Sequence, residues 1–150
     1  MTDNTERKTD TGLLLKKIHD LMEKQANRAL KDMDLTFSQH HVLIFLEHCE
    51  NGEASLKEAE KQFRVAQSTM AGLARRLEEK GLVQSYYDDA DRRIKMIRLS
   101  EEGRRLCRRS RRDFDEKQTI LTKGLKKNEQ AELRRMLETV YQNLQASETE

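Results

Sequence analysis

Apolar residues recur at intervals of three and four along most of this chain, which is the period of an amphipathic helix. The first such stretch begins near Gly12, and the last ends near Leu144. The sequence contains no Pro and only 6 Gly, which agrees with a mostly helical protein. Six helices are predicted in this way, at about residues 12–31, 36–49, 55–63, 67–80, 100–123 and 128–145.

Polar residues at the helix boundaries support these predictions. Thr36 is followed three residues later by Gln39, and Ser55 by Glu58. Each pair is typical of a capping box, in which two side chains and two main-chain N–H groups satisfy one another at a helix start. Gly81 is expected to end the fourth helix, and Asn128 is expected to cap the last one.

A short helix, a turn of three residues and a longer helix follow one another over residues 55–80, which is the length and pattern of a helix-turn-helix. The apolar face of the longer helix is formed by Met70, Leu73 and Leu77. Reading of base edges requires polar residues in the first turn of the second helix, and such residues lie off this apolar face. The candidate DNA-contacting residues of this helix are Gln67, Ser68, Thr69, Arg75 and Arg76.

The segment after this helix is typical of a hairpin. Leu82-Val83 begins an apolar strand, Asp88–Arg93 forms a charged turn, and Ile94–Leu99 returns as a second strand. The sequence therefore predicts a mainly α (α+β) fold: a winged helix-turn-helix over about residues 35–100 with a two-stranded wing. Such a unit places a helix in the major groove of DNA and a charged wing beside it.

The turn of the hairpin carries the candidate wing residues. Because Asp91 and Arg93 are two apart in a turn, we expect the carboxylate to hold the guanidinium in one rotamer. A preset Arg loses less entropy when it enters a narrow minor groove. The alternative is an ordinary surface ion pair, worth about 0–1 kcal/mol. The candidate DNA contacts of the wing are Asp91, Arg92, Arg93 and Lys95.

Charge is unevenly distributed along the chain. The net charge is only +2, but residues 61–112 contain 15 Lys and Arg against 7 Asp and Glu, which gives +8, and the remainder carries −6. The basic segment is where DNA phosphates would be met. Six of these arginines fall within residues 104–112. They are expected either to follow a DNA backbone or to pair with acidic residues of a neighbouring helix.

Four motifs in a fixed order resemble the MarR family of bacterial transcription regulators. They are Leu35-Thr36-x-x-Gln39, Leu77-Glu78-x-Lys80-Gly81-Leu82-Val83, Asp91-x-Arg93 and Leu99-Ser100-x-x-Gly103. The resemblance covers about residues 13–144 and implies a repressor. It implies a homodimer held by N- and C-terminal dimerisation helices (about residues 12–31 and 101–145), a palindromic operator on double-stranded DNA, and release by a small-molecule signal. It also implies that Arg93 is the wing arginine and Asp91 its orienting partner.

The resemblance names further candidate residues. A ligand pocket is implied where the first, second and long helices meet the winged unit, lined by His19, Met22, His41 and Phe45. A terminal apolar stripe facing away from a small core is usually an oligomer contact. The candidate dimer interface is formed by Leu14, Ile18, Leu133, Met136, Leu137, Val140 and Leu144.

Two positions depart from the family pattern. Ala66 stands where related proteins usually carry a Ser or Thr cap, at a typical cost of about 1 kcal/mol. Gly72 stands where a polar side chain often reaches DNA, so this position reads no base by its side chain. The operator sequences that related proteins prefer therefore do not predict the operator of this chain.

The histidines and cysteines of the chain indicate alternative functions of the same fold, as metal or thiol sensors. His40, His41, His48 and Cys49 lie on one predicted helix, but adjacent histidines point about 100° apart and cannot chelate one ion together. Cys107 lies among arginines, which favours a thiolate, whereas a buried and inert thiol is the plainer interpretation. A thiol-responsive or metal-responsive regulator therefore remains an alternative. A basic helical protein that binds nucleic acid without sequence preference is another.

Other classes of protein find no support in the sequence. No nucleophile motif, phosphate loop or carboxylate pair indicates catalysis, so no enzyme, cofactor or metal is expected. Residues 1–11 are polar and are predicted to be a disordered tail before a single domain over residues 12–150. With no apolar signal core and no stretch long enough for a membrane span, a cytoplasmic protein is expected.

Overall fold

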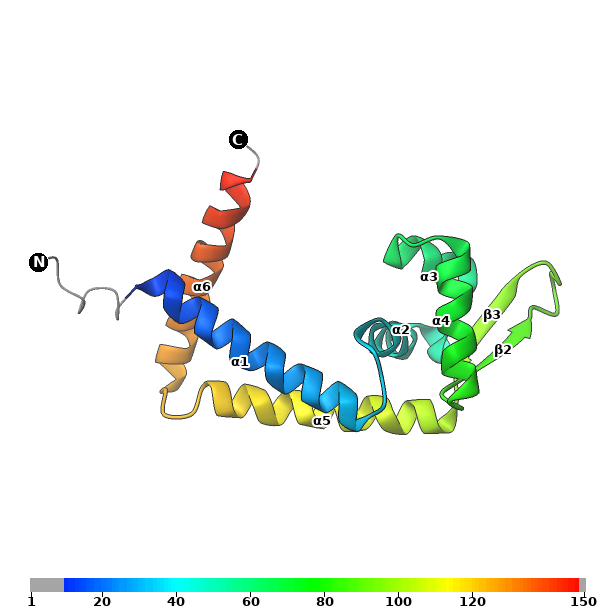
Figure 1. The fold of residues 1–150 in the computed structure, drawn as a ribbon, viewed down its shortest axis with the longest axis horizontal. Coiled ribbons are helices and arrows are strands. Elements are labelled where there is room, and N and C mark those ends of the chain that lie inside the picture. Colours follow the sequence, from blue (N-terminus) through cyan, green and yellow to red (C-terminus); the bar gives the residue numbers. More distant parts are fainter. Residues whose placement is uncertain (1–9, 149–150) are drawn as a thin grey trace, which may run out of the picture. The chain divides into compact units, whose positions relative to one another are not determined.

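The computed structural model of this protein describes residues 10–148, so most of the predicted tail lies outside the described residues. The helices are α1 (Thr11–Asp32), α2 (Phe37–His48), α3 (Leu56–Phe63), α4 (Gln67–Glu79), α5 (Glu101–Leu121) and α6 (Lys127–Ser147). The strands are β1 (Glu53–Ser55), β2 (Val83–Tyr87) and β3 (Lys95–Leu99). The mainly α (α+β) winged helix-turn-helix fold is confirmed (Figure 1). The chain forms two compact units, one reaching to Arg108 and the other beginning at Arg109.

The first unit is built around a small apolar core. Its largest fully buried side chains are contributed by α2, α4, the sheet and the start of α5. They include Leu43, Leu46, Met70, Leu77 and Ile97. Both predicted capping boxes are present, at the N-terminal ends of α2 and α3. These caps fix where the two helices begin, because each satisfies main-chain donors that a helix start leaves without a partner.

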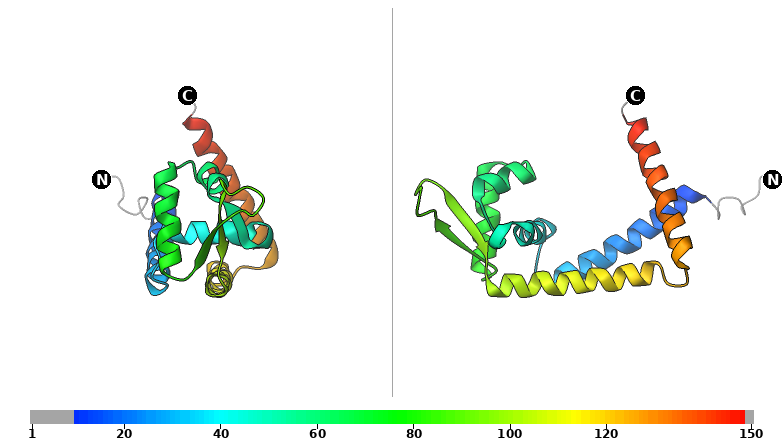
Figure 2. Two further views of the ribbon diagram at one scale, coloured as in Figure 1. Left: turned by 90° about the vertical axis from the view of Figure 1, so that its right-hand side faces the viewer. Right: turned by 180° about the vertical axis from the view of Figure 1, so that it is seen from behind.

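The sheet has three antiparallel strands in the order β1-β3-β2, whereas the sequence predicted two. β2 and β3 form the predicted hairpin, which extends beyond α4 in Figures 1 and 2. The missed strand β1 pairs with the base of β3, where Ala54 lies opposite Ile97. A strand of three residues is too short for its side-chain alternation to be read from sequence. Ile97 and Leu99, at the base of β3, are buried in the core.

The start of α5 packs against the turn between α4 and β2. Ser100 accepts from the N–H of Gly103 at 3.0 Å and donates its hydroxyl to the carbonyl of Gly81 at 2.6 Å. The main-chain N–H of Ser100 donates to Leu82 O at 3.0 Å. Ser100 therefore caps α5, as predicted, and also fixes the helix to Gly81, whose φ of +73° favours glycine.

The second unit contains the rest of α5 and α6. Gly124, with a φ of +87°, lies in the turn between the two helices. The predicted cap at Asn128 is wrong: the N-cap of α6 is Lys126, and Asn128 lies in the first turn. The N–H of Lys126 donates to the carboxylate of Glu129 at 2.7 Å. Asn128 is the second residue inside the helix, so its side chain cannot act as the N-cap.

Candidate nucleic-acid interface

The first turn of α4 presents three polar side chains. Gln67, Ser68 and Thr69 are exposed, whereas Met70 and Leu77 of the same helix are buried in the core. Ala66, at the N-cap, makes no side-chain hydrogen bond to the helix. The helix start is thus held by its packing rather than by a polar cap. Main-chain N–H groups at such an end are suited to an anionic oxygen.

Arg75 and Arg76 lie further along α4, and both are exposed. Arg75 lines a shallow groove of about 410 Å³ together with Ser68, Gly72 and Lys95. A side chain added at Gly72 would meet no atom within 4 Å. The absence of a side chain at this position therefore leaves open space beside the wing.

The wing holds Arg93 in the orientation expected from sequence. Its Nε donates to one carboxylate oxygen of Asp91 at 3.0 Å, and a terminal guanidinium nitrogen donates to the other at 3.0 Å. The main-chain N–H of Arg93 adds a third bond to Asp91 at 3.1 Å. These bonds to Arg93 lower the pKa of Asp91 from its ordinary value, because they stabilise the ionised carboxylate. Arg93 is nevertheless 90% exposed, and the pair leaves its outer face open.

The base of the wing is held by contacts that the sequence did not predict. Tyr86 of β2 donates its hydroxyl to Glu53 of β1 at 2.6 Å, which raises the pKa of Tyr86. Arg98 of β3 lies 3.7 Å from the same carboxylate, and its guanidinium lies 4.9 Å from the centre of the Tyr86 ring. One carboxylate thus joins all three strands. These residues come together through the missed strand β1, so no sequence spacing indicated them.

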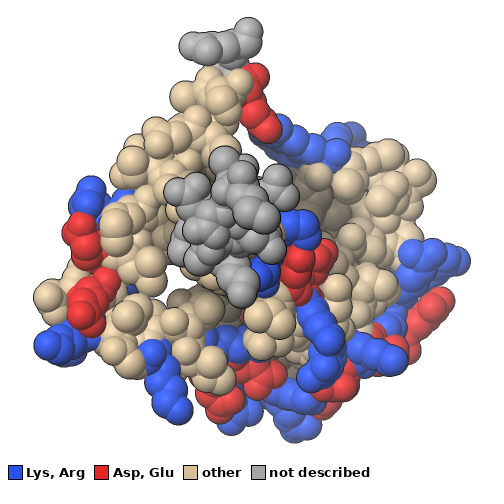
Figure 3. All heavy atoms as spheres, turned by 60° about the vertical axis from the view of Figure 1, so that its left-hand side comes forward, with Lys and Arg blue, Asp and Glu red and all other residues tan. Residues whose placement is uncertain are grey.

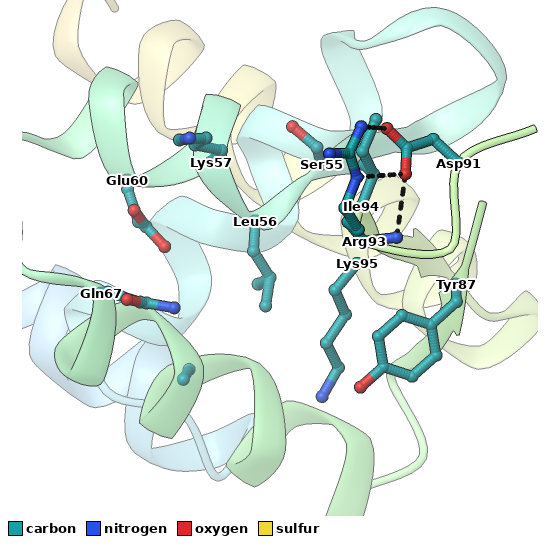
Figure 4. Close-up of a pocket in the computed structure, with 11 residues that line it drawn as sticks. Ser55, Leu56, Lys57, Glu60, Gln67, Tyr87, Asp91, Arg93, Ile94 and Lys95 are labelled. Atoms are coloured by element: carbon teal, nitrogen blue, oxygen red, sulfur yellow. Dashed lines mark hydrogen bonds and ion pairs between the residues drawn. The ribbon is translucent and has the colours of Figure 1, made fainter.

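A groove of about 810 Å³ brings α3, α4 and the wing together (Figure 4). Gln67 of α4 lines one side, and Arg93 and Lys95 of the wing line the other. Lys57 and Tyr87 also line the groove and were missed by sequence reasoning. The nitrogen of Lys95 lies 6.0 Å from the centre of the Tyr87 ring. The structure therefore brings the candidate residues Gln67, Asp91, Arg93 and Lys95 to one groove, and Arg92, on the same turn, lies 4.0 Å from Asp89.

The arginines at the start of α5 make contacts within the chain. Arg104 donates to the carbonyl of Asn51 at 2.8 Å, and Arg105 donates to Glu102 at 3.0 Å. Arg108 lies 3.7 Å from Glu101. These three side chains therefore have partners on η2 (Glu50–Gly52) or on the first turn of α5 itself. These partners are not acidic residues of a neighbouring helix, which was one of the two expectations, because the two carboxylates belong to α5 and the third acceptor is a main-chain carbonyl. Contact of these arginines with a DNA backbone stays a prediction.

The candidate ligand residues lie on two helices. His41 and Phe45 are on α2, where the ring of His41 stacks 4.1 Å from Phe37 and Phe45 packs edge-on against Phe63 at 5.6 Å. His19 and Met22 are exposed on α1. A ligand pocket formed by all four residues stays a prediction.

The environments of the two cysteines bear on the thiol-sensing alternative. Burial and the nearby Glu58 raise the pKa of Cys49, which disfavours its thiolate. Cys107 is fully buried, with its sulfur 3.7 Å from the carbonyl of Leu43. Both environments suit an unreactive thiol.

The candidate dimer residues are mostly exposed in the single chain. Within the first unit, Leu14 and Ile18 of α1 are 59% and 40% exposed, and α1 has no buried residue. Within the second unit, Met136, Leu137 and Leu144 of α6 are exposed, and Leu133 and Val140 are half-buried. Uncharged surface lies between clusters of basic and acidic side chains on the face drawn in Figure 3.

Among residues 10–148, no helix is long and apolar enough to cross a membrane.

Comparisons with known proteins agree with this geometry. The MarR family profile matches residues 33–94. The transcriptional repressor IacR of Pseudomonas putida is 31% identical over 131 residues, which cover 87% of this chain and 77% of that protein. MepR of Staphylococcus aureus, solved in complex with DNA, superposes with a TM-score of 0.80 at 27% identity, over 89% of this chain and 98% of that one.

A MarR family protein from Bacillus stearothermophilus shares the fold, with a TM-score of 0.70 at 22% identity, over 96% of this chain and 99% of that one. The members of this family are transcription regulators and not enzymes. The chain belongs to the MarR family of DNA-binding transcription regulators.

Proposed function

We propose that this protein is a repressor that binds a palindromic operator as a homodimer and is released by a small-molecule signal. The groove that brings Gln67 of α4 and Arg93 of the wing together carries the DNA-binding part of this proposal. Two relatives support it, because IacR is a transcriptional repressor and MepR was solved in complex with DNA.

The two sides of the groove would contact different parts of the duplex. With the first turn of α4 in the major groove, Gln67, Ser68 and Thr69 reach base edges. Arg93 then enters the adjacent minor groove, oriented by Asp91. The sugar-phosphate strand that separates the two grooves lies between helix and wing, where Lys57 and Lys95 supply positive charge. Arg75 and Arg76, on later turns, contact phosphates.

The apolar faces of α1 and α6 support a homodimer. They leave large side chains such as Leu14 and Leu144 in contact with water in the single chain. Burying such a side chain contributes about 1.5–3 kcal/mol, and a second copy supplies an equivalent face by two-fold symmetry. Two-fold symmetry in turn requires two equivalent half-sites on one side of the duplex, about one helical turn apart or a small multiple of it.

Release by a small molecule requires a site for that ligand on the protein. His41 and Phe45 support it, because they join Phe37 and Phe63 in a row of rings on α2 and α3. Such rings could stack on a planar apolar ligand. Binding of that ligand would have to favour a conformation with lower operator affinity.

Replacing Gln67 by alanine tests the assignment of the recognition helix. We expect specific affinity to fall by about 1–3 kcal/mol and base preference to relax at one position in each half-site. Arg76→Ala is the comparison: it should weaken cognate and random DNA alike and flatten the salt dependence. The measurement is quantitative binding to a randomised half-site library at two salt concentrations. An unchanged base preference in Gln67→Ala would show that α4 does not read the sequence.

Replacing Asp91 by alanine separates orientation of Arg93 from simple electrostatics. Removing a negative charge near DNA should tighten binding if charge alone matters. If the carboxylate orients Arg93, Asp91→Ala should instead weaken specific binding by about 1 kcal/mol, and Arg93→Ala by about 1–2 kcal/mol. In the Arg93→Ala background, Asp91→Ala should cause no further loss. Tighter binding by the Asp91→Ala single variant would contradict an orienting role.

A further inference from the structure

The C-terminal end of α4 is attached to the turn between α1 and α2 by one side chain. Lys80, the C-cap of α4, donates its ammonium to the main-chain carbonyl of Asp34. The same ammonium lies 3.4 Å from the carboxylate of Asp34. The side chain of Lys80 is 30% exposed although it is charged, whereas that of Asp34 is 95% exposed. The Lys80 side chain is therefore partly buried, and its ammonium contacts the exposed Asp34 of the α1–α2 turn.

This turn has the features of a hinge. Asp34 adopts a φ of +54°, a left-handed conformation that Asp tolerates better than most residues. It follows directly on Met33, the C-cap of α1, and precedes Leu35, which is buried in the core. Hinges are commonly a few residues at the end of an element that absorb a change in φ and ψ. A brace across such a turn fixes the direction in which α1 leaves the winged unit.

Further contacts between α1 and the winged unit lie in the same short region. α1 buries no residue of its own, and Leu30 and Met33 pack on the core from its last turn. The N–H of Leu35 donates to the carbonyl of Leu30 at 2.9 Å. The exit angle of this helix therefore depends on contacts near one end, which include the Lys80–Asp34 contact.

The length of α1 amplifies a small change at this end. Its 22 residues extend about 33 Å, so a rotation of about 6° at the turn moves the far end by about 3.4 Å, the rise of one base pair. In the proposed dimer, α1 belongs to the interface between copies. The angle between α1 and α4 then sets the distance between the two recognition helices.

We propose that Lys80 is a positioning residue, which braces the α1–α2 turn against α4 and thereby sets the half-site spacing that the dimer accepts. This inference rests on the proposed homodimer and its palindromic operator. In this role Lys80 acts through Asp34 and does not contact DNA. It therefore affects the spacing of two correct half-sites, and not the base preference within either half-site.

The test is a set of operators with identical half-sites, at the preferred separation and with one base pair inserted or removed. Wild type should bind the altered operators much more weakly. Lys80→Met should lose about fivefold in affinity for the preferred operator and lose most of the discrimination between spacings. The slope of log affinity against log salt concentration should stay unchanged, because no phosphate contact is removed. Lys80→Arg should restore the spacing preference.

Three further variants distinguish this role of Lys80 from a loss of folding. Asp34→Asn retains the main-chain acceptor and the tolerance of positive φ, and should show the same change in smaller degree. Adding Asp34→Asn to Lys80→Met should cause little further change. Lys57→Met is the matched control, since it removes a lysine that faces the groove: its salt slope should fall by about 1 and its spacing preference should persist.

Distinct outcomes would overturn the inference or the proposed function. If Lys80→Met keeps the wild-type spacing preference, or weakens all operators equally with a flatter salt slope, Lys80 is not a positioning residue. If the Lys80→Met variant loses affinity equally for all operators and also has a lower melting temperature, the role of Lys80 is only structural. If wild type itself shows no preference for paired half-sites, the proposed operator binding fails, whatever Lys80 does.

Discussion

Replacing Gly103 by alanine should lower the free energy of unfolding by about 3 kcal/mol or more and the melting temperature by about 10 °C. A Cβ atom at this position would lie 2.1 Å from the carbonyl oxygen of Leu82 and 3.2 Å from the Leu99 side chain. The first of these atoms is main chain, and the same carbonyl accepts the N–H of Ser100. Relief of the clash therefore requires α5 to move away from the α4–β2 turn.

Gly72→Ala is the matched control for this prediction. Its Cβ would meet no atom within 4 Å, and Gly72 lies inside α4. Alanine there should raise stability by roughly 0.5–1 kcal/mol, because glycine costs backbone entropy in a helix. Thermal and denaturant unfolding of both variants measure the difference. A Gly103→Ala protein as stable as wild type would contradict the close approach of α5 to Leu82.

Replacing Leu137 by glutamate should dissociate the proposed homodimer at micromolar concentration. The substitution removes a large apolar side chain from the centre of the α6 stripe and introduces a charge that is costly to bury. Because a two-fold interface contains the position twice, the effect is doubled. The dimer dissociation constant should rise by more than about 100-fold, which corresponds to about 2.7 kcal/mol. Affinity for a palindromic operator should fall with it.

Gln142→Glu adds the same charge to the same helix and serves as the control. Gln142 is exposed and lies about 140° around the helix from Leu137. It should leave the mass of the particle and the operator affinity unchanged. Size-exclusion chromatography with light scattering measures the mass, and far-UV circular dichroism checks that both variants fold. A monomeric wild type would remove the homodimer from the proposal. A Leu137→Glu variant that stays dimeric would show that the α6 stripe is not the dimer interface.

Local features of the sequence were sufficient to predict most helix boundaries. Both capping boxes, the Gly81 turn and the Ser100 cap are short-range patterns, and each is present. Capping depends on residues within one turn of each other, so sequence spacing alone determines it. The bidentate Asp91–Arg93 pair was predicted for the same reason, because its members are two residues apart.

The arrangement of the candidate site could be predicted only in part. Gln67, Arg93 and Lys95 were chosen as DNA contacts, since a helix-turn-helix followed by a hairpin has a known geometry. The structure places all three around one groove, and their contact with DNA stays a prediction. Lys57 and Tyr87 were missed, because their place in the groove depends on how α3 and β2 pack beside α4. The sequence does not show which exposed residues from distant segments will lie on the same surface of the folded protein.

The sequence by itself determined the six helices, the wing hairpin, the order of the motifs and the family resemblance, because these depend on residues close together in the chain. Only the tertiary structure decided the third strand, the clash that excludes a side chain at Gly103, and the brace between Lys80 and Asp34. The last of these joins residues 46 positions apart. Such contacts are set by how complete elements pack, and their energies arise from close approach and burial, which a linear pattern does not encode.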